Sequence, residues 1–343
     1  MSEPVTKRVG FVAIGRDEGE RLRSCLESVG AGLGHVVYVD SGSTDGSVEL
    51  ARSAGADVVE LDTSRPLTAA RGRNAGFEHL VQVAHGVEFV QFIDGDSEMI
   101  DGWLDEALEY LATHPDVGAV CGRIVERYPN ASVYNRLCDM EWNRPAGETR
   151  ACGGNTMIRV EAFRQAGGFL SGMVAGEEAE LCARLRQKGW RIVQLSTPMV
   201  LHDAGMTRLG QWWKRAVRAG RAYAESLTLH RHSQDRHNIR GARSAVLWGA
   251  GVPAAALVLG VAAAWHPWTL AFLALIVGAY GTLLVKVYRH RRERGERPRH
   301  ALLYASFCLL AKVPQCIGVV GFACSRLRRT RPKVVACRSA GEA

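Results

Sequence analysis

Acidic residues are scarce in the C-terminal part of this chain. Residues 206–343 contain 5 Asp and Glu against 23 Lys and Arg, whereas residues 1–205 contain 30 against 20. The net charge of +8 therefore conceals two parts of opposite charge. The basic part is also the more apolar one, and basic clusters that flank apolar segments are typical of contacts with anionic lipid headgroups. We therefore expect membrane lipids as partners and no nucleic acid.

Metal-binding cysteine patterns and a secretory leader are also lacking. The nine cysteines form no Cys-x-x-Cys pair and no His/Cys cluster with zinc-ligand spacing, which predicts reduced and mostly buried thiols. The first apolar run, residues 9–14, is too short for the apolar region of a signal peptide, and Arg16 follows almost at once. The N-terminal part is therefore expected to stay in the cytoplasm.

Charged residues are missing altogether between Ser244 and Val285. This segment is about twice the ~20 residues that a helix needs to cross a bilayer, and it breaks at residues 265–268, where two Trp flank His-Pro. We expect two transmembrane helices, at about 244–264 and 268–288, joined by a short external loop. Arginines on both flanks then lie in the cytoplasm, as basic flanks prefer.

Two further segments of the basic part are expected at the membrane surface. Residues 206–243 contain paired Trp among Lys and Arg, which suits an interfacial helix, although an ordinary surface helix docked on the N-terminal domain has the same pattern. Residues 289–343 begin as a basic loop, and their apolar stretch at 301–325 is interrupted by Lys312 and Pro314. We expect a re-entrant or interfacial helical hairpin there, with a third transmembrane span as the alternative.

The acidic part, residues 1–205, alternates between short apolar runs and helical patterns. Apolar or β-branched runs at 9–14, 35–40, 57–61 and 87–93 are separated by helical patterns at 18–29, 46–54 and 67–84. Such alternation predicts βαβ units and a parallel sheet, whose ligands bind beyond the carboxyl ends of the strands. Polar clusters follow three of these strands, so we expect a binding site at that edge.

The strongest of these clusters is Asp94-Gly95-Asp96, which directly follows an apolar strand. Two carboxylates at this spacing offer the hard oxygen ligands that Mg²⁺ or Mn²⁺ prefers, with room left for substrate phosphates. The structural alternative is an Asx-type turn that caps the next helix. Asp101 is, however, already a suitable cap for that helix. The motif is weak when it is taken alone.

Three other clusters each have a structural and a functional interpretation. Asp40 stands at a strand end, where it is either part of a turn or an acceptor for a base or ribose. Arg71 and Arg73 lie near the start of a helix and suit phosphate, or a solvated face. Glu177 and Glu178 open another helix, where the helix dipole favours them and where a carboxylate can also serve as a general base.

In chain order, these clusters resemble the motifs of the inverting, GT-A-fold glycosyltransferases of family 2. The matching segments extend over about residues 9–205 and are Arg-Asp-Glu-Gly at 16–19, Val-Asp-Ser-Gly-Ser-Thr-Asp-Gly at 39–46, Ala-Arg-Gly-Arg-Asn-Ala-Gly at 70–76, Asp-Gly-Asp at 94–96, Gly-Gly-Asn-Thr-Met at 153–157, Gly-Gly-Phe at 167–169 and Gly-Glu-Glu-Ala-Glu-Leu at 176–181. The resemblance implies an α/β fold: a GT-A domain of the Rossmann-like, nucleotide-diphospho-sugar transferase type over residues 1–205, followed by C-terminal transmembrane helices. The C-terminal part resembles the membrane anchors of bacterial members.

The resemblance also implies roles for the matched positions. Glu178 takes the place of the catalytic base, where the family more often has Asp, and Asp96 with His202 would bind Mg²⁺ or Mn²⁺. The nucleotide sugar is expected to contact Ala13, Glu18, Asp40, Arg71, Arg73 and Asp94. The donor sugar or the acceptor is expected to contact Gly154, Asn155, Glu177 and Trp212. Many relatives have Asp where this chain has Asn155.

These roles predict a membrane-anchored inverting glycosyltransferase. The expected donor is a UDP-sugar, with GDP-mannose next, and the expected acceptor is a lipid-linked or cell-envelope glycan, with polyprenyl phosphate as the alternative. We expect a multi-pass protein of the cell inner membrane with a cytoplasmic catalytic domain. A nucleotidyltransferase is disfavoured, because no G-x-G-x-R-L loop follows the first strand. An inactive, membrane-tethered sugar-binding scaffold is the alternative from another class. Residues 211–215 match the Q-x-x-R-W motif of processive members only in part, so processive synthesis is not expected.

Overall fold

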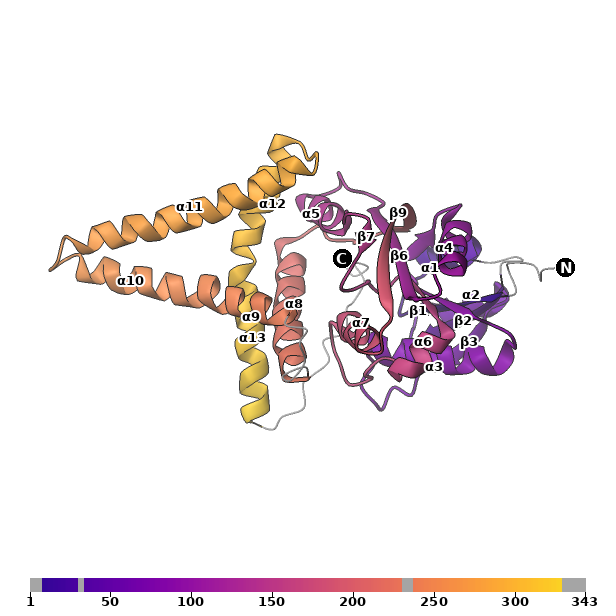
Figure 1. Cartoon of the computed structure of the whole chain (residues 1–343). Helices are drawn as coiled ribbons and strands as arrows, with labels where there is room; N and C mark the ends of the chain where they lie inside the picture. The colour runs from indigo at the N-terminus through magenta and orange to yellow at the C-terminus, as the bar shows by residue number, and fades with distance from the viewer. Residues whose placement is uncertain (1–7, 30–33, 230–236, 329–343) are drawn as a thin grey trace. The chain divides into compact units, whose positions relative to one another are not determined.

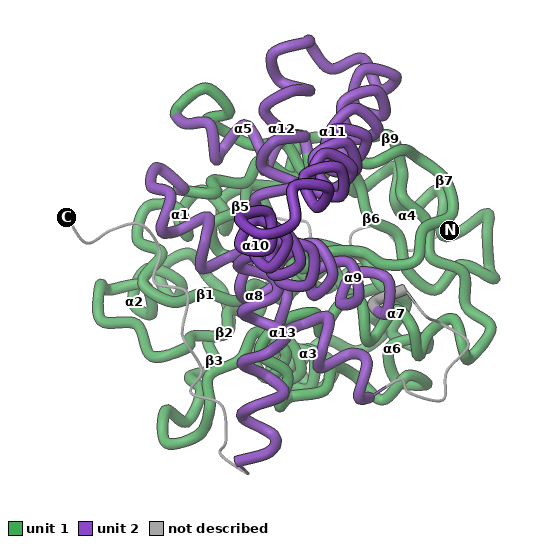
Figure 2. Tube along the Cα trace, turned by 90° about the vertical axis from the view of Figure 1, so that its left-hand side faces the viewer, with its two compact units in different colours: residues 1–131, 141–205, 333–343 green, residues 132–140, 206–332 purple. Residues whose placement is uncertain are grey.

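The computed structural model describes residues 8–29, 34–229 and 237–328 (Figure 1). The chain divides into two compact units (Figure 2). The described part of unit 1 lies within residues 8–131 and 141–205, and that of unit 2 within residues 132–140 and 206–328.

Unit 1 is built on a mixed sheet with the strand order β3-β2-β1-β4-β8-β6-β9-β5, in which β7 pairs with β9. Its strands are β1 (Val9–Gly15), β2 (His35–Asp40), β3 (Asp57–Glu60), β4 (Phe89–Asp94), β5 (Ser97–Met99), β6 (Val117–Glu126), β7 (Gly147–Glu148), β8 (Thr156–Arg159) and β9 (Arg191–His202). The strands β1 to β4 are mutually parallel, as expected. The complete sheet is mixed, because β8 lies antiparallel between β4 and β6.

The helices of unit 1 cover both faces of this sheet. They are α1 (Glu20–Val29), α2 (Ser47–Ser53), α3 (Ala69–Val83), α4 (Trp103–Thr113), α6 (Val160–Ala166) and α7 (Glu177–Gln187), whereas α5 (Val133–Trp142) belongs mostly to unit 2. Because side chains alternate along a strand, Gln91 and Phe92 of β4 point to opposite faces. Phe92 packs on Phe163 of α6, while Gln91 accepts a hydrogen bond from Trp103 of α4 at 2.9 Å.

The local sequence explains how α3 packs against the sheet. Thr68 caps this helix by accepting a hydrogen bond from the backbone N–H of Arg71, so the helix begins after the Arg65-Pro66 signal and not at it. A Cβ atom on Gly76 would lie 2.3 Å from Val12 of β1, so only glycine lets the helix approach the strand this closely. A Cβ atom there would also lie 2.8 Å from Val39 of β2, so α3 packs across β1 and β2.

Unit 2 is helical, and its described residues include three helices that are long and apolar enough to cross a membrane, at Ile239–Ala262, Thr269–Glu293 and Pro298–Leu327. Its elements are α8 (Leu209–Leu229), α9 (His237–Val246), the π-helix η2 (Leu247–Gly251), α10 (Val252–Ala262), α11 (Thr269–Glu293), α12 (Pro298–Leu310) and α13 (Lys312–Leu327). The fold class is therefore as expected, an α/β domain followed by candidate membrane helices.

The helical hairpin expected at 301–325 is not formed. Ala311, between α12 and α13, keeps a helical conformation with φ −57° and ψ −23°, so the chain does not reverse direction there. Pro314 cannot donate to the carbonyl of Leu310, which explains why the helix is broken at this point and not further along. Residues 298–327 thus form one interrupted helix, and whether it spans a bilayer stays a prediction.

Candidate active site

The Asp94-Gly95-Asp96 turn lies directly against the end of β1. The N–H of Gly95 donates to the carbonyl of Ile14 at 2.8 Å. A Cβ atom on Gly95 would lie 3.2 Å from that same oxygen and 3.3 Å from Cγ of Glu18. A side chain at this position would push the turn away from β1, so the glycine allows both aspartates to sit at the sheet edge.

Asn155 holds both sides of the same turn. Its side chain is buried, and Oδ1 accepts a hydrogen bond from the N–H of Asp94 at 2.8 Å. Its Nδ2 donates to Oγ of Ser97 at 3.2 Å. The position was predicted to contact the donor sugar or the acceptor. In the structure its amide group fixes the conformation of the two-aspartate turn, and any sugar contact stays a prediction.

His202 is placed beside Asp96 by strand pairing. The antiparallel register of β5 and β9 sets Ser97 opposite His202, and Nε2 of His202 lies 3.5 Å from Oδ1 of Asp96. One ligand atom each from Asp94, Asp96 and His202 lies within 4.8 Å of the others. Burial raises the pKa of Asp96, and Asp94 raises it further.

Two atoms of this triad lack a hydrogen-bond partner among the described residues. They are Oδ1 of Asp96 and Nδ1 of His202, and both are buried. Two carboxylates and one imidazole are suitable ligands for a divalent cation, which would satisfy the orphaned carboxylate oxygen. The residues present therefore fit a divalent metal.

Arg73 links this turn to the start of α7. Its side chain is only 3% exposed, and Nη2 lies 2.8 Å from Oδ1 of Asp94. Nη1 lies 3.0 Å from Glu177 and 3.5 Å from Glu178. Three carboxylates thus share one buried guanidinium. Burial lowers the pKa of Arg73, but the three carboxylates together raise it above its ordinary value. In the structure the charge of Arg73 is paired within the protein, and its predicted contact with the nucleotide sugar stays a prediction.

Glu178 has the proton affinity of a base that works near neutral pH. Burial and the neighbouring Glu177 raise its pKa to about 7, although Arg73 acts in the opposite direction. A general base is most effective when its pKa lies near the working pH. The side chain remains partly accessible, with 23% of its surface exposed.

The other predicted nucleotide contacts differ in how free their side chains are. Glu18 pairs with Arg21 at 2.6 Å, and burial together with Asp96 raises the pKa of Glu18 to about 7. Asp40 is buried, and its carboxylate accepts hydrogen bonds from Tyr38, Ser43 and the N–H of Gly42. Contacts of these two residues with a nucleotide stay predictions.

Three predicted contacts have structural roles in this fold. Arg71 donates to the backbone carbonyl of Asp62 at 2.8 Å. Trp212 belongs to unit 2, where its buried ring packs edge-on against Phe307. Ala13 is wholly buried in the middle of β1, paired with strands on both sides. Its side chain is thus enclosed by the sheet, and a contact of Ala13 with the nucleotide stays a prediction.

A cavity of about 400 Å³ opens beside the two-aspartate turn. It is lined by Asp94, Ile124, Glu141, Trp142, Arg144, Gly153, Gly154, Asn155 and His202. Pockets for small ligands typically enclose about 300–1,000 Å³, so this one has a suitable size. It brings together residues that are separated by more than one hundred positions in the sequence.

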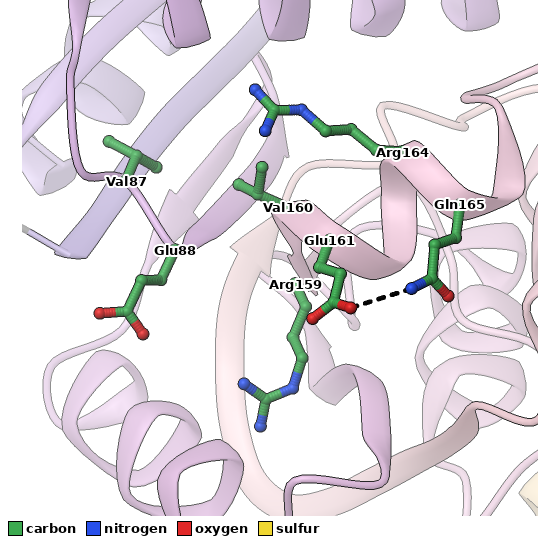
Figure 3. A pocket seen from close by; sticks show the side chains of 7 residues that line it. All are labelled: Val87, Glu88, Arg159, Val160, Glu161, Arg164 and Gln165. Atoms are coloured by element: carbon green, nitrogen blue, oxygen red, sulfur yellow. Dashed lines mark hydrogen bonds between the residues drawn. The ribbon is translucent and has the colours of Figure 1, made fainter.

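A second hollow of about 380 Å³ lies where β8 runs into α6 (Figure 3). Three of the charged side chains that line it are engaged within unit 1: Arg159 donates to the carbonyl of Val117, Glu161 accepts from Gln165, and Glu88 pairs with Arg8. None of the predicted site residues lines it, so it carries no part of the candidate site.

Comparison with known proteins indicates the family of the domain that unit 1 contains. The sequence model of the family described as "Glycosyl transferase family 2" matches residues 15–167, a range that contains the two-aspartate turn, Arg73 and Asn155. The chain carries a family 2 glycosyltransferase domain. The resemblance drawn from the ordered motifs is thereby confirmed.

Curated relatives of the family 2 domain agree with this assignment. The chain is 28% identical over 242 residues to the "Pre-mycofactocin glycosyltransferase" of Mycobacterium tuberculosis, which covers 67% of this chain and 49% of that protein. It is 25% identical to the "Succinoglycan biosynthesis protein ExoA" of Rhizobium meliloti, covering 62% and 66% of the two chains. It is 24% identical to the "Glycosyltransferase AglE" of Haloferax volcanii, covering 68% and 76%. The matched part spans about half the length of the first of these relatives.

A solved structure shares the fold of the family 2 domain and of the helices that follow it. The mannosyltransferase PcManGT from Pyrobaculum calidifontis, a complex with GDP-Man and Mn²⁺, superposes with a TM-score of 0.59 at 21% identity. The superposition covers 90% of this chain and 87% of that one. The expected GT-A fold is therefore confirmed.

Besides Ile124 of β6, sequence reasoning missed three residues that line the cavity of the family 2 domain, namely Glu141, Trp142 and Arg144. They lie between the matched motifs, in a stretch with no periodic pattern or motif of its own. Only the fold brings this stretch to the cavity, so no signal in the sequence could have found it.

Proposed function

We propose that this chain is a membrane-bound inverting glycosyltransferase. It transfers a sugar from a nucleotide-diphosphate sugar to a lipid-linked or cell-envelope glycan. The observation that carries the proposal is the buried guanidinium of Arg73, which joins Asp94 of the two-aspartate turn to Glu178 at the start of α7. Arg73 thus lies between the two-aspartate turn, which is suited to bind a cation, and Glu178, whose pKa suits a general base.

In this proposal Asp94, Asp96 and His202 hold a divalent metal ion. The metal supplies positive charge that stabilises the departing nucleoside diphosphate. An imidazole ligand favours Mn²⁺ over Mg²⁺, since Mg²⁺ is bound almost entirely by oxygen. The Mn²⁺ in the PcManGT complex supports the choice.

Glu178 accepts the proton of the acceptor hydroxyl as that oxygen attacks the anomeric carbon. A single displacement from the face opposite the leaving group inverts the anomeric configuration. The carboxylate is able to accept a proton once it is ionised, which its pKa of about 7 allows at neutral pH. Arg73 holds Glu178 and the turn at a fixed separation, so base and donor site act as one unit.

The donor is a UDP-sugar or GDP-mannose. The GDP-Man bound to PcManGT supports a nucleotide-sugar donor. The name of the Rhizobium relative, a succinoglycan biosynthesis protein, supports a glycan product. Polyprenyl phosphate remains the alternative acceptor.

The membrane part of the proposal rests on unit 2. Its three apolar helices and their basic flanks support an acceptor that is anchored in lipid. We propose domain limits of 1–205 for catalysis, 206–243 for interfacial helices, 244–288 for two spans and 289–343 for the basic remainder. We also propose the cell inner membrane as the location, with the catalytic domain in the cytoplasm.

Transfer assays with membranes that contain the chain test the proposal. Radiolabelled UDP-sugars and GDP-mannose are supplied with Mn²⁺, and the released nucleotide and the anomeric configuration of the product are determined. We expect nucleoside diphosphate, an inverted linkage, and loss of transfer in Asp96→Ala. The matched control is Asp101→Ala, an exposed aspartate beyond the turn, which should transfer at the wild-type rate. Diphosphate release would indicate a nucleotidyltransferase, and metal-independent sugar binding without turnover would indicate a scaffold.

A further inference from the structure

Trp142 packs against His202. The two ring centroids are 4.8 Å apart and the ring planes are inclined by 50°. The contact joins the last residue of α5 to the last residue of β9, and both side chains line the 400 Å³ cavity. The indole is therefore in direct contact with His202, which is grouped with Asp94 and Asp96 as a candidate metal site.

Hydrogen bonding alone does not fix the imidazole of His202. A metal-binding histidine usually donates its second ring N–H to a carboxylate, a carbonyl or a water molecule, and this bond fixes the orientation of the ring. Among the described residues Nδ1 of His202 is buried without such a partner, while Nε2 faces Asp96 at 3.5 Å. Strand register determines where the backbone of His202 lies, but it leaves rotation of the ring free.

We infer that Trp142 is the positioning residue that holds His202 in its metal-binding orientation. The indole fills one side of the imidazole, so that the ring keeps Nε2 directed at Asp96. The inference rests on the proposed function, because it assumes the metal site of Asp94, Asp96 and His202. It adds a residue that touches neither metal nor phosphate and acts only through the histidine.

Mn²⁺ binding tests this inference without any turnover. The purified full-length protein in detergent is titrated with Mn²⁺ in the absence of donor and acceptor, and free Mn²⁺ is measured by electron paramagnetic resonance. Loss of an outer-shell partner typically weakens metal binding by about 10–100-fold, so we expect at least about a tenfold weaker Kd in Trp142→Ala. Trp142→Phe, which keeps an aromatic ring, should restore most of the affinity.

A double-mutant cycle with His202→Ala separates positioning from an independent contact. If Trp142 acts through the histidine, the double variant should bind Mn²⁺ as weakly as His202→Ala alone, to within about twofold. Pulsed measurements should also detect nitrogen coupling to Mn²⁺ in the wild type and lose most of it in Trp142→Ala. Additive losses, or a wild-type Kd in Trp142→Ala, would overturn the inference; additivity would indicate that the indole supports the metal site independently of His202.

Two control variants, Trp190→Ala and Asp96→Ala, distinguish a failure of the inference from a failure of the proposed metal site. Trp190, which donates to Gln165 at 2.9 Å and does not line the cavity, offers a matched loss of a tryptophan in the same unit. Trp190→Ala should leave the Mn²⁺ Kd unchanged, and an equal loss of affinity there would overturn the inference. If Asp96→Ala abolishes Mn²⁺ binding while Trp142→Ala does not change it, the inference alone is wrong. If Asp96→Ala has no effect, the metal site of the proposed function is wrong and the inference fails with it.

Discussion

Nη1 of Arg73 lies 3.5 Å from Oε1 of Glu178, the proposed base. The same guanidinium pairs with Asp94 at 2.8 Å through its other terminal nitrogen. The side chain of Arg73, which was predicted to bind phosphate, thus links the Asp94-Gly95-Asp96 turn to the start of α7. Its neutralising charge explains how several carboxylates can be gathered at one sheet edge.

Replacing Arg73 should destabilise the protein strongly. In Arg73→Gln three carboxylates lose their shared cation, and breaking a buried ion pair typically costs about 3–5 kcal/mol. The matched control is Arg52→Gln, which breaks an exposed pair with Glu60 at 2.6 Å and should cost about 1 kcal/mol or less. Apparent Tm values of the two full-length variants in detergent measure the difference. Equal Tm losses in the two variants would contradict the central role of Arg73.

Sugar transfer should increase with pH around neutrality. The pKa of Glu178 is raised to about 7, so the carboxyl group is mainly protonated below this pH and mainly ionised above it. The charged groups that face it are Glu177 on the same helix, Arg73 on α3 and Asp94 at the end of β4. Because the base must be ionised, kcat/KM should fall as the pH drops below about 7 and level off above it.

The pH profile of initial rates at saturating Mn²⁺ provides the measurement. Glu178→Gln should lower kcat by about 10²–10⁴-fold, the usual contribution of a general base, while nucleotide binding survives. Its residual activity should no longer follow the ionisation near pH 7. A wild-type profile that is flat from pH 6 to pH 8 would argue against Glu178 as the base.

Adding one methyl group to Gly154 should disrupt the link between Arg73 and Asp94. A Cβ atom there would lie 2.2 Å from Nη2 of Arg73 and 2.9 Å from Oδ2 of Asp94, so the pair has to separate. The neighbouring Gly153 is the control, because its Cβ atom would meet only Ile124 at an ordinary 3.8 Å. We expect Gly154→Ala to lose most transfer activity and Gly153→Ala to keep it. Similar activities of the two variants would show that the pair is not needed.

The sequence predicted the first four strands well, because their apolar runs are continuous and bounded by polar residues. It failed at β8, since Thr156–Arg159 follows the Gly-Gly-Asn motif and carries no alternation that reveals its antiparallel direction. Of the triad Asp94, Asp96 and His202, local spacing predicts only the two aspartates, and His202 was expected at the metal from the family resemblance alone. His202 joins them through the pairing of β5 with β9, which no local pattern encodes.

The roles of individual site residues were harder to predict than their positions. Arg73 and Asn155 were assigned to substrate, whereas in the structure their polar groups are engaged by Asp94, Ser97 and the start of α7. A motif shows that a side chain is required, but it does not show which neighbour the side chain satisfies. In unit 2 the basic flanks of 301–325 suggested a hairpin. The backbone at Ala311 is helical, so the chain continues in the same direction there.

Packing within unit 2 yields a last prediction, which concerns the contact between α8 and α13. A Cβ atom on Gly318 would lie 2.1 Å from the carbonyl oxygen of Val217 and 2.8 Å from the backbone nitrogen of Arg221. Backbone atoms cannot rotate away as a flexible side chain can, so Gly318→Ala should force the two helices apart at a cost of about 1–3 kcal/mol. At Gly321, three residues along the same helix, no atom of the part of the chain that the structure describes lies within 4 Å of the Cβ position. Gly321→Ala should therefore be neutral or slightly stabilising, since alanine is favoured over glycine inside a helix by about 1 kcal/mol. Thermal unfolding of both full-length variants in the same detergent compares them, and a Tm for Gly318→Ala equal to that of Gly321→Ala would show that α8 and α13 are not packed this closely.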